Sequence, residues 1–298
     1  MRGCGGNRTN SSRNKEGVGV KKHVLGIALA VAVLLFGASA CGGGGTASSK
    51  TLTVGATAVP HAEILNDVVK PELAKEGIDL KVVIFQDYVQ PNEKLYEKEL
   101  DANYFQHLPF LEQTNQEKGY NLIPLVGVHI EPMGAYVAKG KAYKNAQDLP
   151  NNAVVAITND PTNVGRMLLL LERQGLIKLK EGVGAKAQIT DVVENPKNIK
   201  FHQMDAAMLP KALDDPKIDL VLINTNFALQ AGLNPLKDAI FLEDSSSPYV
   251  NVLAVRPDSK DDPRIQKLAE VLLSPAVKEY IETKYKGAVV PAQVRYGN

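Results

Sequence analysis

The sequence has no tryptophan and only two cysteines among 298 residues, and its 34 basic residues nearly balance its 33 acidic ones. Two cysteines cannot form the disulfide framework on which small secreted domains depend. Residues 1–40 hold six of the basic residues and one acidic residue, which leaves 28 and 32 in the remainder, a net charge of −4. This remainder has no basic run of the kind that follows phosphate groups, so no nucleic-acid partner is expected.

The motifs of the common catalytic sites are also missing. The sequence contains neither a Gly-x-Ser-x-Gly nucleophile elbow nor a His-Glu-x-x-His zinc motif. The acidic pairs Asp214–Asp215 and Asp261–Asp262 lie in polar turns followed by proline, which is typical of solvated carboxylates. His61, His129 and His202 are scattered along the chain, without the close spacing of a zinc site. We therefore expect no enzymatic activity, no metal and no cofactor.

The N-terminal region is typical of a secretory signal sequence. Lys21 and Lys22 precede the apolar segment Val24–Phe36, and small residues lead to Cys41. The 17 uncharged residues before Cys41 are at the short limit for a bilayer-spanning helix, so an uncleaved membrane anchor is the alternative. The small residues ending in cysteine resemble a bacterial lipobox, although Ala38 stands where leucine is usual. Cys41 would then be the lipid-modified first residue of the mature protein.

The expected processing divides the N-terminal region into two segments. Residues 1–40 are expected to be the signal sequence, and residues 41–49 the lipidated cysteine and a flexible tether of Gly, Ser, Thr and Ala. Residues 1–20 are unusually long and polar for the start of a signal sequence, so the natural start is expected near Val18 or Val20. The lipid would hold the protein on the extracytoplasmic face of the cell membrane.

The remaining chain alternates short β-type runs with amphipathic segments, and it opens in the order strand, helix, strand. That order implies parallel pairing in an α/β sheet. The first helix should end at Gly77 and break or kink at Pro71. We expect strands at 50–58, 80–85, 122–129, 134–138, 153–157, 218–223, 239–242 and 250–255, and later helices at 162–174, 262–273 and 276–285. This layout predicts two α/β lobes, with the chain crossing between them near 134–138 and again near 249–255.

Two polar and aromatic segments follow strands, where α/β sheets bind their ligands. Tyr88 lies in the segment after the second strand, and it offers a ring face and a hydroxyl group. Phe105 and His107 stand with Tyr104 at the end of a short strand. A thioether packs well against aromatic edges. Either segment can also be an ordinary strand-to-helix turn, and a lone histidine is more often structural than a metal ligand.

The segment Asn159–Arg166 gives the strongest indication of a ligand group. A strand leads into it and a leucine-rich helix leaves it, with Asp160 or Thr162 as the capping residue. The helix start favours a carboxylate, and Arg166 adds a planar fork that binds a carboxylate through two hydrogen bonds. The alternative is an arginine that caps or bridges on the surface. The sequence therefore predicts an α-carboxylate site here.

Two asparagines lie at or near the ends of other predicted strands. Asn224 ends one strand, and Asn251 lies at the second crossing between the lobes. An amide can accept from an ammonium group and donate to a carboxylate. Either asparagine can equally be a turn residue.

The ordered set of these motifs resembles the methionine-binding lipoprotein family of ABC importers, the NlpA/MetQ type. The resemblance covers essentially all of residues 50–296. Each motif alone is modest, but their order is specific: the signal sequence with its lipobox, DYVQPN, DANYFQH, NDPTNVGR, DVVENPKNIK, LINTNFA and SPYVN.

The resemblance implies a two-lobed periplasmic-binding-protein fold, type II-like, with a ligand cleft between the lobes. Lobe 1 would comprise residues 50–134 and 250–298, and lobe 2 residues 135–249. The protein would be a monomer that binds L-methionine, with D-methionine or a Met-containing peptide as alternatives. It would deliver this ligand to an ABC permease and its ATPase.

The resemblance also implies ligand contacts, which carry over motif by motif. Arg166 corresponds to the arginine that binds the carboxylate, Asn224 and Asn251 to the asparagines that hold the head group, and Tyr88, Phe105 and His107 to the remaining pocket positions. Tyr104 replaces a small residue of some relatives, and it is given no role. The stretch Gly127–Met133 matches the family loosely, and it is assigned no pocket contact.

Three other functions are compatible with parts of the sequence. A lipoprotein that binds a metal or another amino acid would keep the anchor and the fold. A lipoprotein enzyme would need an activated nucleophile or a metal, neither of which the sequence indicates. A surface adhesin would leave Arg166 and Asn224 exposed to solvent.

Overall fold

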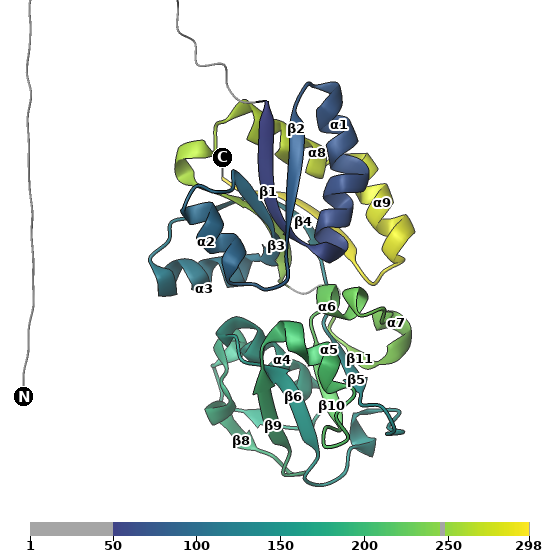
Figure 1. The fold of residues 1–298 in the computed structure, drawn as a ribbon. Coiled ribbons are helices and arrows are strands. Elements are labelled where there is room, and N and C mark those ends of the chain that lie inside the picture. Colours follow the sequence, from purple (N-terminus) through teal and green to yellow (C-terminus); the bar gives the residue numbers. More distant parts are fainter. Residues whose placement is uncertain (1–49, 245–247, 298) are drawn as a thin grey trace, which may run out of the picture. The chain divides into compact units, whose positions relative to one another are not determined.

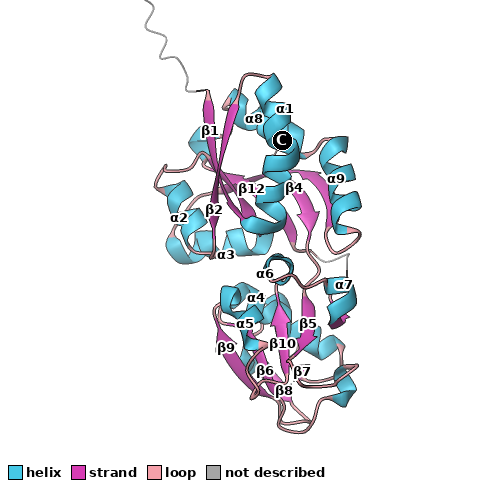
Figure 2. Cartoon of the chain, turned by 45° about the vertical axis from the view of Figure 1, so that its right-hand side comes forward, coloured by secondary structure: helices cyan, strands magenta, loops and turns pink. Residues whose placement is uncertain are grey.

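The computed structural model describes residues 50–244 and 248–297, and every structural statement below concerns these residues. The described chain forms two larger β-sheets and one small strand pair, all shown in Figures 1 and 2 with their helices. No described helix is both long and apolar enough to cross a membrane.

The first sheet has six strands in the order β13-β4-β12-β3-β1-β2. Strands β1, β2 and β3 pair in parallel, whereas β12 and β13 join the sheet antiparallel to their neighbours. This sheet is built from both ends of the described chain: β1 Thr51–Thr57, β2 Asp79–Phe85, β3 Ala102–His107, β4 Ile123–Ile130, β12 Val250–Val255 and β13 Val290–Arg295.

The second sheet has five strands in the order β11-β5-β10-β6-β9. Strands β10, β6 and β9 are parallel, and β5 and β11 run antiparallel at one edge. All five come from the middle of the chain: β5 Gly134–Val137, β6 Val154–Thr158, β9 Lys200–Met204, β10 Leu220–Ile223 and β11 Ala239–Leu242. The separate pair is β7 Lys178–Leu179 with β8 Val192–Glu194.

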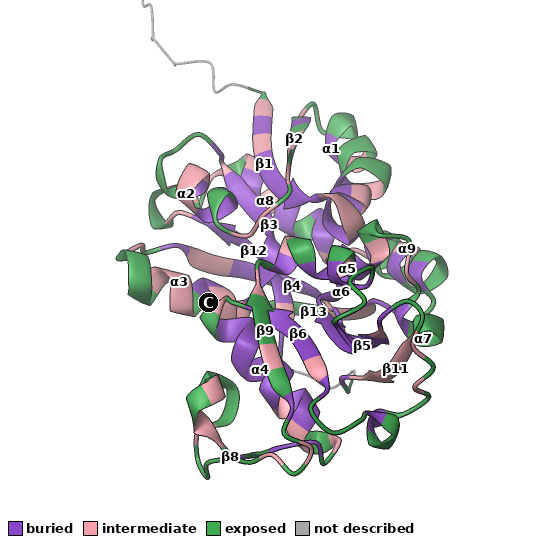
Figure 3. Ribbon diagram, turned by 60° about the horizontal axis from the view of Figure 1, so that its bottom comes forward, coloured by how far each residue is buried: buried purple, intermediate pink, exposed green. Residues whose placement is uncertain are grey.

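Helices cover both faces of the first sheet, because its strands alternate apolar side chains between the faces. In β12, Leu253 and Val255 pack in one cluster with α8 and α9, while Val252 and Ala254 pack in another with α2 and α3. Figure 3 shows β12 as buried along most of its length. The helices of this part are α1 Lys70–Lys75, α2 Gln90–Tyr96, α3 Leu108–Lys118, α8 Pro263–Leu272 and α9 Pro275–Tyr285.

Helix α4 is the principal helix of the second sheet, and its sequence explains its limits. Asp160 caps it by accepting a hydrogen bond from the Asn163 backbone N–H, and Pro161 occupies the first turn. Gly175 adopts φ +69° just beyond its end. Its leucine run packs in the core of this sheet. The helices of this part are α4 Pro161–Arg173, α5 Leu209–Ala212, α6 Thr225–Gln230 and α7 Pro235–Asp238.

The expected strands are all present, within a few residues of their predicted bounds. The chain leaves the first sheet at Ile130 and enters the second at Gly134, and it returns between Leu242 and Val250. The helix does not break at Pro71, but its winding changes just before that residue. A π-helical turn at Leu65–Val69 leads directly into α1, and Pro71 lies in the first turn of α1.

Gly165 allows α4 to approach the turn Gly184–Lys186 closely. A β-carbon on Gly165 would lie 2.1 Å from the Ala185 carbonyl oxygen, a backbone atom that cannot rotate away. We predict that Gly165→Ala lowers the free energy of unfolding by about 1–3 kcal/mol through overpacking. Urea unfolding measures the effect. Arg173→Ala, at the exposed end of the same helix, is the control and should change it by less than about 0.5 kcal/mol.

Candidate functional site

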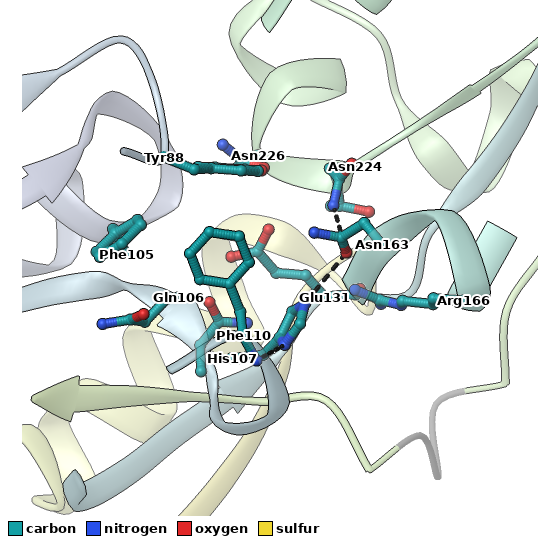
Figure 4. Close-up of a pocket in the computed structure, with 12 residues that line it drawn as sticks. Tyr88, Phe105, Gln106, His107, Phe110, Glu131, Asn163, Arg166, Asn224 and Asn226 are labelled. Atoms are coloured by element: carbon teal, nitrogen blue, oxygen red, sulfur yellow. Dashed lines mark hydrogen bonds between the residues drawn. The ribbon is translucent and has the colours of Figure 1, made fainter. Parts of the chain in front are cut away.

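One pocket gathers residues from both larger sheets and the segments that follow their strands. The space between the atoms of its lining amounts to about 340 Å³, part of which is open to solvent. Figure 4 shows the side chains around it. Its lining comprises Tyr88, Phe105, Gln106, His107, Phe110, Glu131, Asn163, Arg166, Asn224, Thr225, Asn226 and Asn251.

One side of the pocket is an aromatic wall, made of Tyr88, Phe105 and Phe110. The Tyr88 ring lies 6.1 Å from Phe105, 5.8 Å from Phe110 and 5.0 Å from Phe227, measured between ring centroids. The Tyr88 hydroxyl donates a hydrogen bond of 2.5 Å to Asn226 Oδ1. The aromatic wall therefore presents apolar ring surface to the pocket, because its one hydroxyl already has a partner.

Asn163 is the acceptor on which two pocket side chains converge. His107 Nδ1 accepts from the Phe110 backbone N–H, so His107 Nε2 carries the proton and donates to Asn163 Oδ1 at 3.1 Å. Asn224 Nδ2 donates to the same oxygen at 3.1 Å. Burial, reinforced by the charge of Arg166, lowers the pKa of His107 to about 3, so its ring is neutral.

Arg166 projects from α4 and is 4% exposed. Its Nε bonds both carboxylate oxygens of Glu243 at 3.0 Å, and its Nη2 bonds Glu243 and also the Glu131 carbonyl oxygen at 2.7 Å. The Tyr249 ring centroid lies 4.3 Å from the guanidinium carbon. The pair of hydrogen bonds that Arg166 was expected to form with a ligand carboxylate is thus formed with Glu243. Nη1 has no hydrogen-bond partner in the described chain, and it is the donor left for a ligand.

The start of α4 does not offer the carboxylate site that the sequence predicts. Asp160 itself fills that position, accepting hydrogen bonds from the backbone N–H and the side-chain amide of Asn163. A second carboxylate there would be repelled by Asp160. The anion-binding capacity of this region therefore rests on Arg166 rather than on the helix end.

Behind the pocket, His61 and His129 meet although 68 positions separate them in the sequence. Their ring centroids are 4.9 Å apart, and together with Glu131 they place three donor atoms within 4.8 Å of one another. The fold thus assembles a group that the scattered histidines did not predict. Each of these donor atoms already has a protein partner, since His129 Nε2 bonds Glu131 at 2.7 Å and His61 Nε2 bonds Asn251 at 3.0 Å. The expectation of no metal stays a prediction.

Two amide atoms in the pocket lack hydrogen-bond partners among the described residues although they are buried. They are Asn224 Oδ1, an acceptor, and Asn226 Nδ2, a donor. A buried polar group without a partner costs about 1–3 kcal/mol. Both atoms are therefore available to a ligand that carries an acceptor and a donor.

All six residues predicted as ligand contacts, Tyr88, Phe105, His107, Arg166, Asn224 and Asn251, line this one pocket. Asn163 and Asn226 were missed, although they lie inside the motifs that contain Arg166 and Asn224. Assigning no pocket contact to Gly127–Met133 was wrong, because Glu131 is a lining residue. Tyr104 is fully buried and bonds His129 instead of lining the pocket.

The two sheets and the pocket lined from both define a two-lobed substrate-binding protein. Residues 52–293 match the family described as NlpA lipoprotein, and the chain belongs to this family.

Individual relatives agree with this assignment. The methionine-binding lipoprotein MetQ of Bacillus subtilis is 42% identical over 275 residues, covering 91% of this chain and 99% of that protein. A nutrient-binding protein from Burkholderia cenocepacia, whose structure was solved bound to methionine, is 45% identical with a TM-score of 0.77, over 81% of this chain and 99% of that one. A periplasmic substrate-binding protein of an ABC transporter from Coxiella burnetii is 39% identical with a TM-score of 0.75, over 81% and 100%.

Three buried histidines predict that acid destabilises the fold. Burial lowers the pKa of His61 to about 4 and those of His107 and His129 to about 3, from 6.5 in an unfolded chain. Because the unfolded state binds protons first, the free energy of unfolding should fall as pH drops from about 6.5 toward 4, by about 1.4 kcal/mol per histidine and pH unit.

Urea unfolding at several pH values measures this dependence. The variant His107→Gln should have a shallower slope than the wild type, and the variant His202→Gln, at an exposed position, should keep the wild-type slope. Equal slopes in the wild type and His107→Gln would contradict the role assigned to this buried ring.

Proposed function

We propose that the protein binds methionine as a zwitterion and delivers it to an ABC permease. The observation that carries this proposal is the pair of unpartnered amide atoms, Asn224 Oδ1 and Asn226 Nδ2, in a pocket that also holds Arg166 and Glu131. An α-amino acid carries a donor group and an acceptor group on one carbon, which matches this requirement. The proposal assigns binding and no catalysis.

The head group would be divided between two sets of pocket atoms. The ligand carboxylate would accept hydrogen bonds from Arg166 Nη1 and Asn226 Nδ2, and the ammonium would donate to Glu131 and Asn224 Oδ1. Both ligand charges must be paired, because the residues around them are buried. His107 would contribute mainly by holding Asn163, to which it is bonded.

The side chain of the ligand would lie on the aromatic wall. Tyr88, Phe105 and Phe110 present ring surface in several orientations, and a flexible, polarizable thioether adapts well to such a surface. The names of the similar proteins from Bacillus subtilis and Burkholderia cenocepacia support methionine over other apolar amino acids.

The proposed setting is the outer face of the cell membrane. The lipobox-like sequence supports lipidation of Cys41, which lies outside the described residues, as do the signal sequence and the whole tether. The transporter named for the similar Coxiella burnetii protein supports an ABC permease and its ATPase as partners. We propose that the protein acts as a monomer.

The primary test is calorimetric titration of protein stripped of ligand by unfolding and refolding. The panel comprises the twenty amino acids, D-methionine and Met-containing dipeptides, with zinc and manganese for the metal alternative. We expect one-to-one binding of methionine in preference to all other natural amino acids. Binding of zinc without any amino-acid signal would replace this proposal by metal capture.

Arg166→Lys tests the carboxylate contact while keeping a positive charge beside Glu243. Arg166→Ala is less suitable, because it would leave Glu243 buried without its partner. Lysine cannot reproduce the planar set of donors, so we predict a loss of about 2–5 kcal/mol in methionine binding. Arg173→Lys on the same helix is the control. Unchanged affinity for methionine in a folded Arg166→Lys variant would contradict the proposed contact between Arg166 and the ligand carboxylate.

A further inference from the structure

Two chains of hydrogen bonds lie behind the pocket, and each links two strands of the first sheet that have one other strand between them. One runs from Tyr104 through His129 to Glu131, and the other from Thr57 through His61 to Asn251. Both histidine side chains are essentially inaccessible, at 1% and 0% exposure. Neither histidine lines the pocket, but each chain ends on a residue that does.

The partners determine which nitrogen of each ring carries the proton. A carboxylate only accepts, so His129 Nε2 donates to Glu131 Oε1 at 2.7 Å, and His129 Nδ1 accepts from the Tyr104 hydroxyl. An amide oxygen also only accepts, so His61 Nε2 donates to Asn251 Oδ1 at 3.0 Å, and His61 Nδ1 accepts from Thr57 at 2.8 Å. Both rings are therefore neutral and protonated on Nε2, in agreement with the lowered pKa of each.

These proton positions fix the polarity of the pocket surface. His129 holds one carboxylate oxygen of Glu131, and His61 Nε2 lies 3.4 Å from the same oxygen. His61 also binds the amide oxygen of Asn251, so the amide nitrogen of Asn251 is the end left for the pocket. Reversal of either tautomer would set two acceptors against each other and release Glu131 or Asn251 from its position.

We propose that His61 and His129 are positioning residues, which hold Glu131 and Asn251 in the orientation that recognises the ammonium and carboxylate groups of the ligand. This inference rests on the proposed function. It adds that the two histidines affect binding of the head group through Glu131 and Asn251, without touching the ligand.

The test compares two ligands and four proteins by calorimetry. The ligands are methionine and its analogue without the amino group, 4-(methylsulfanyl)butanoate, which cannot engage Glu131. The proteins are the wild type, His129→Leu, His129→Gln and the exposed-site control His202→Leu. Leucine removes the donor to Glu131, whereas the glutamine amide can restore it.

We expect His129→Leu to weaken methionine binding about 10- to 100-fold, as for loss of a hydrogen bond to a charged group, and to change the analogue affinity less than about three-fold. His129→Gln should recover most of the methionine affinity, and His202→Leu should match the wild type. Equal losses for both ligands, or no loss for methionine, would overturn the positioning role while leaving the proposed function in place. Failure of the wild type to bind methionine would overturn both.

A second measurement does not depend on a variant that folds. Nitrogen NMR of the histidine rings in the wild-type protein at pH 7 should show His61 and His129 protonated on Nε2 alone, with His202 as the exposed reference. Tyr104→Phe removes the donor to His129 Nδ1 and should weaken methionine binding about 2- to 10-fold. A ring protonated on Nδ1 at His61 or His129 in the wild type would overturn the proposal.

Discussion

The burial of the Arg166 guanidinium is the constraint on which the site depends. A charge that is 4% exposed must be paired, and Glu243 pairs it at the end of the second sheet. The Glu131 carbonyl accepts from Arg166, and the Met133 backbone N–H donates to Glu243 at 3.3 Å. The two chain segments that connect the sheets therefore both form hydrogen bonds with the Arg166 guanidinium group. These bonds fix the geometry of the pocket where the chain passes from one lobe to the other.

Glu131 joins this ion pair to the buried histidines, because its backbone and side chain face different partners. Its carbonyl binds Arg166, and its carboxylate binds His129. Burial raises the pKa of Glu131, while the charge of Arg166 opposes that rise. Glu131 thus lies between the donor and acceptor halves of the proposed head-group site.

The sequence predicts the buried parts of the fold well, because strands such as β10 and β12 are short apolar runs with no room for a helix. It does not predict β9 and β13, whose residues are largely exposed or half-buried and show little apolar pattern. The six predicted contacts lie in local motifs at or near strand ends. Glu243 meets Arg166 across 77 positions, and His61 meets Asn251 across 190, so no local pattern could indicate either pair.

The aromatic wall has a consequence for the chemical state of what the pocket accepts. Tyr88 carries its one hydroxyl, and that group already donates to Asn226. Oxidation of a thioether to a sulfoxide adds a strongly polar oxygen, which would be buried against these rings without a donor. Under the proposed function the pocket would therefore bind methionine in its reduced form only, and cells relying on it would need another route for the oxidised amino acid.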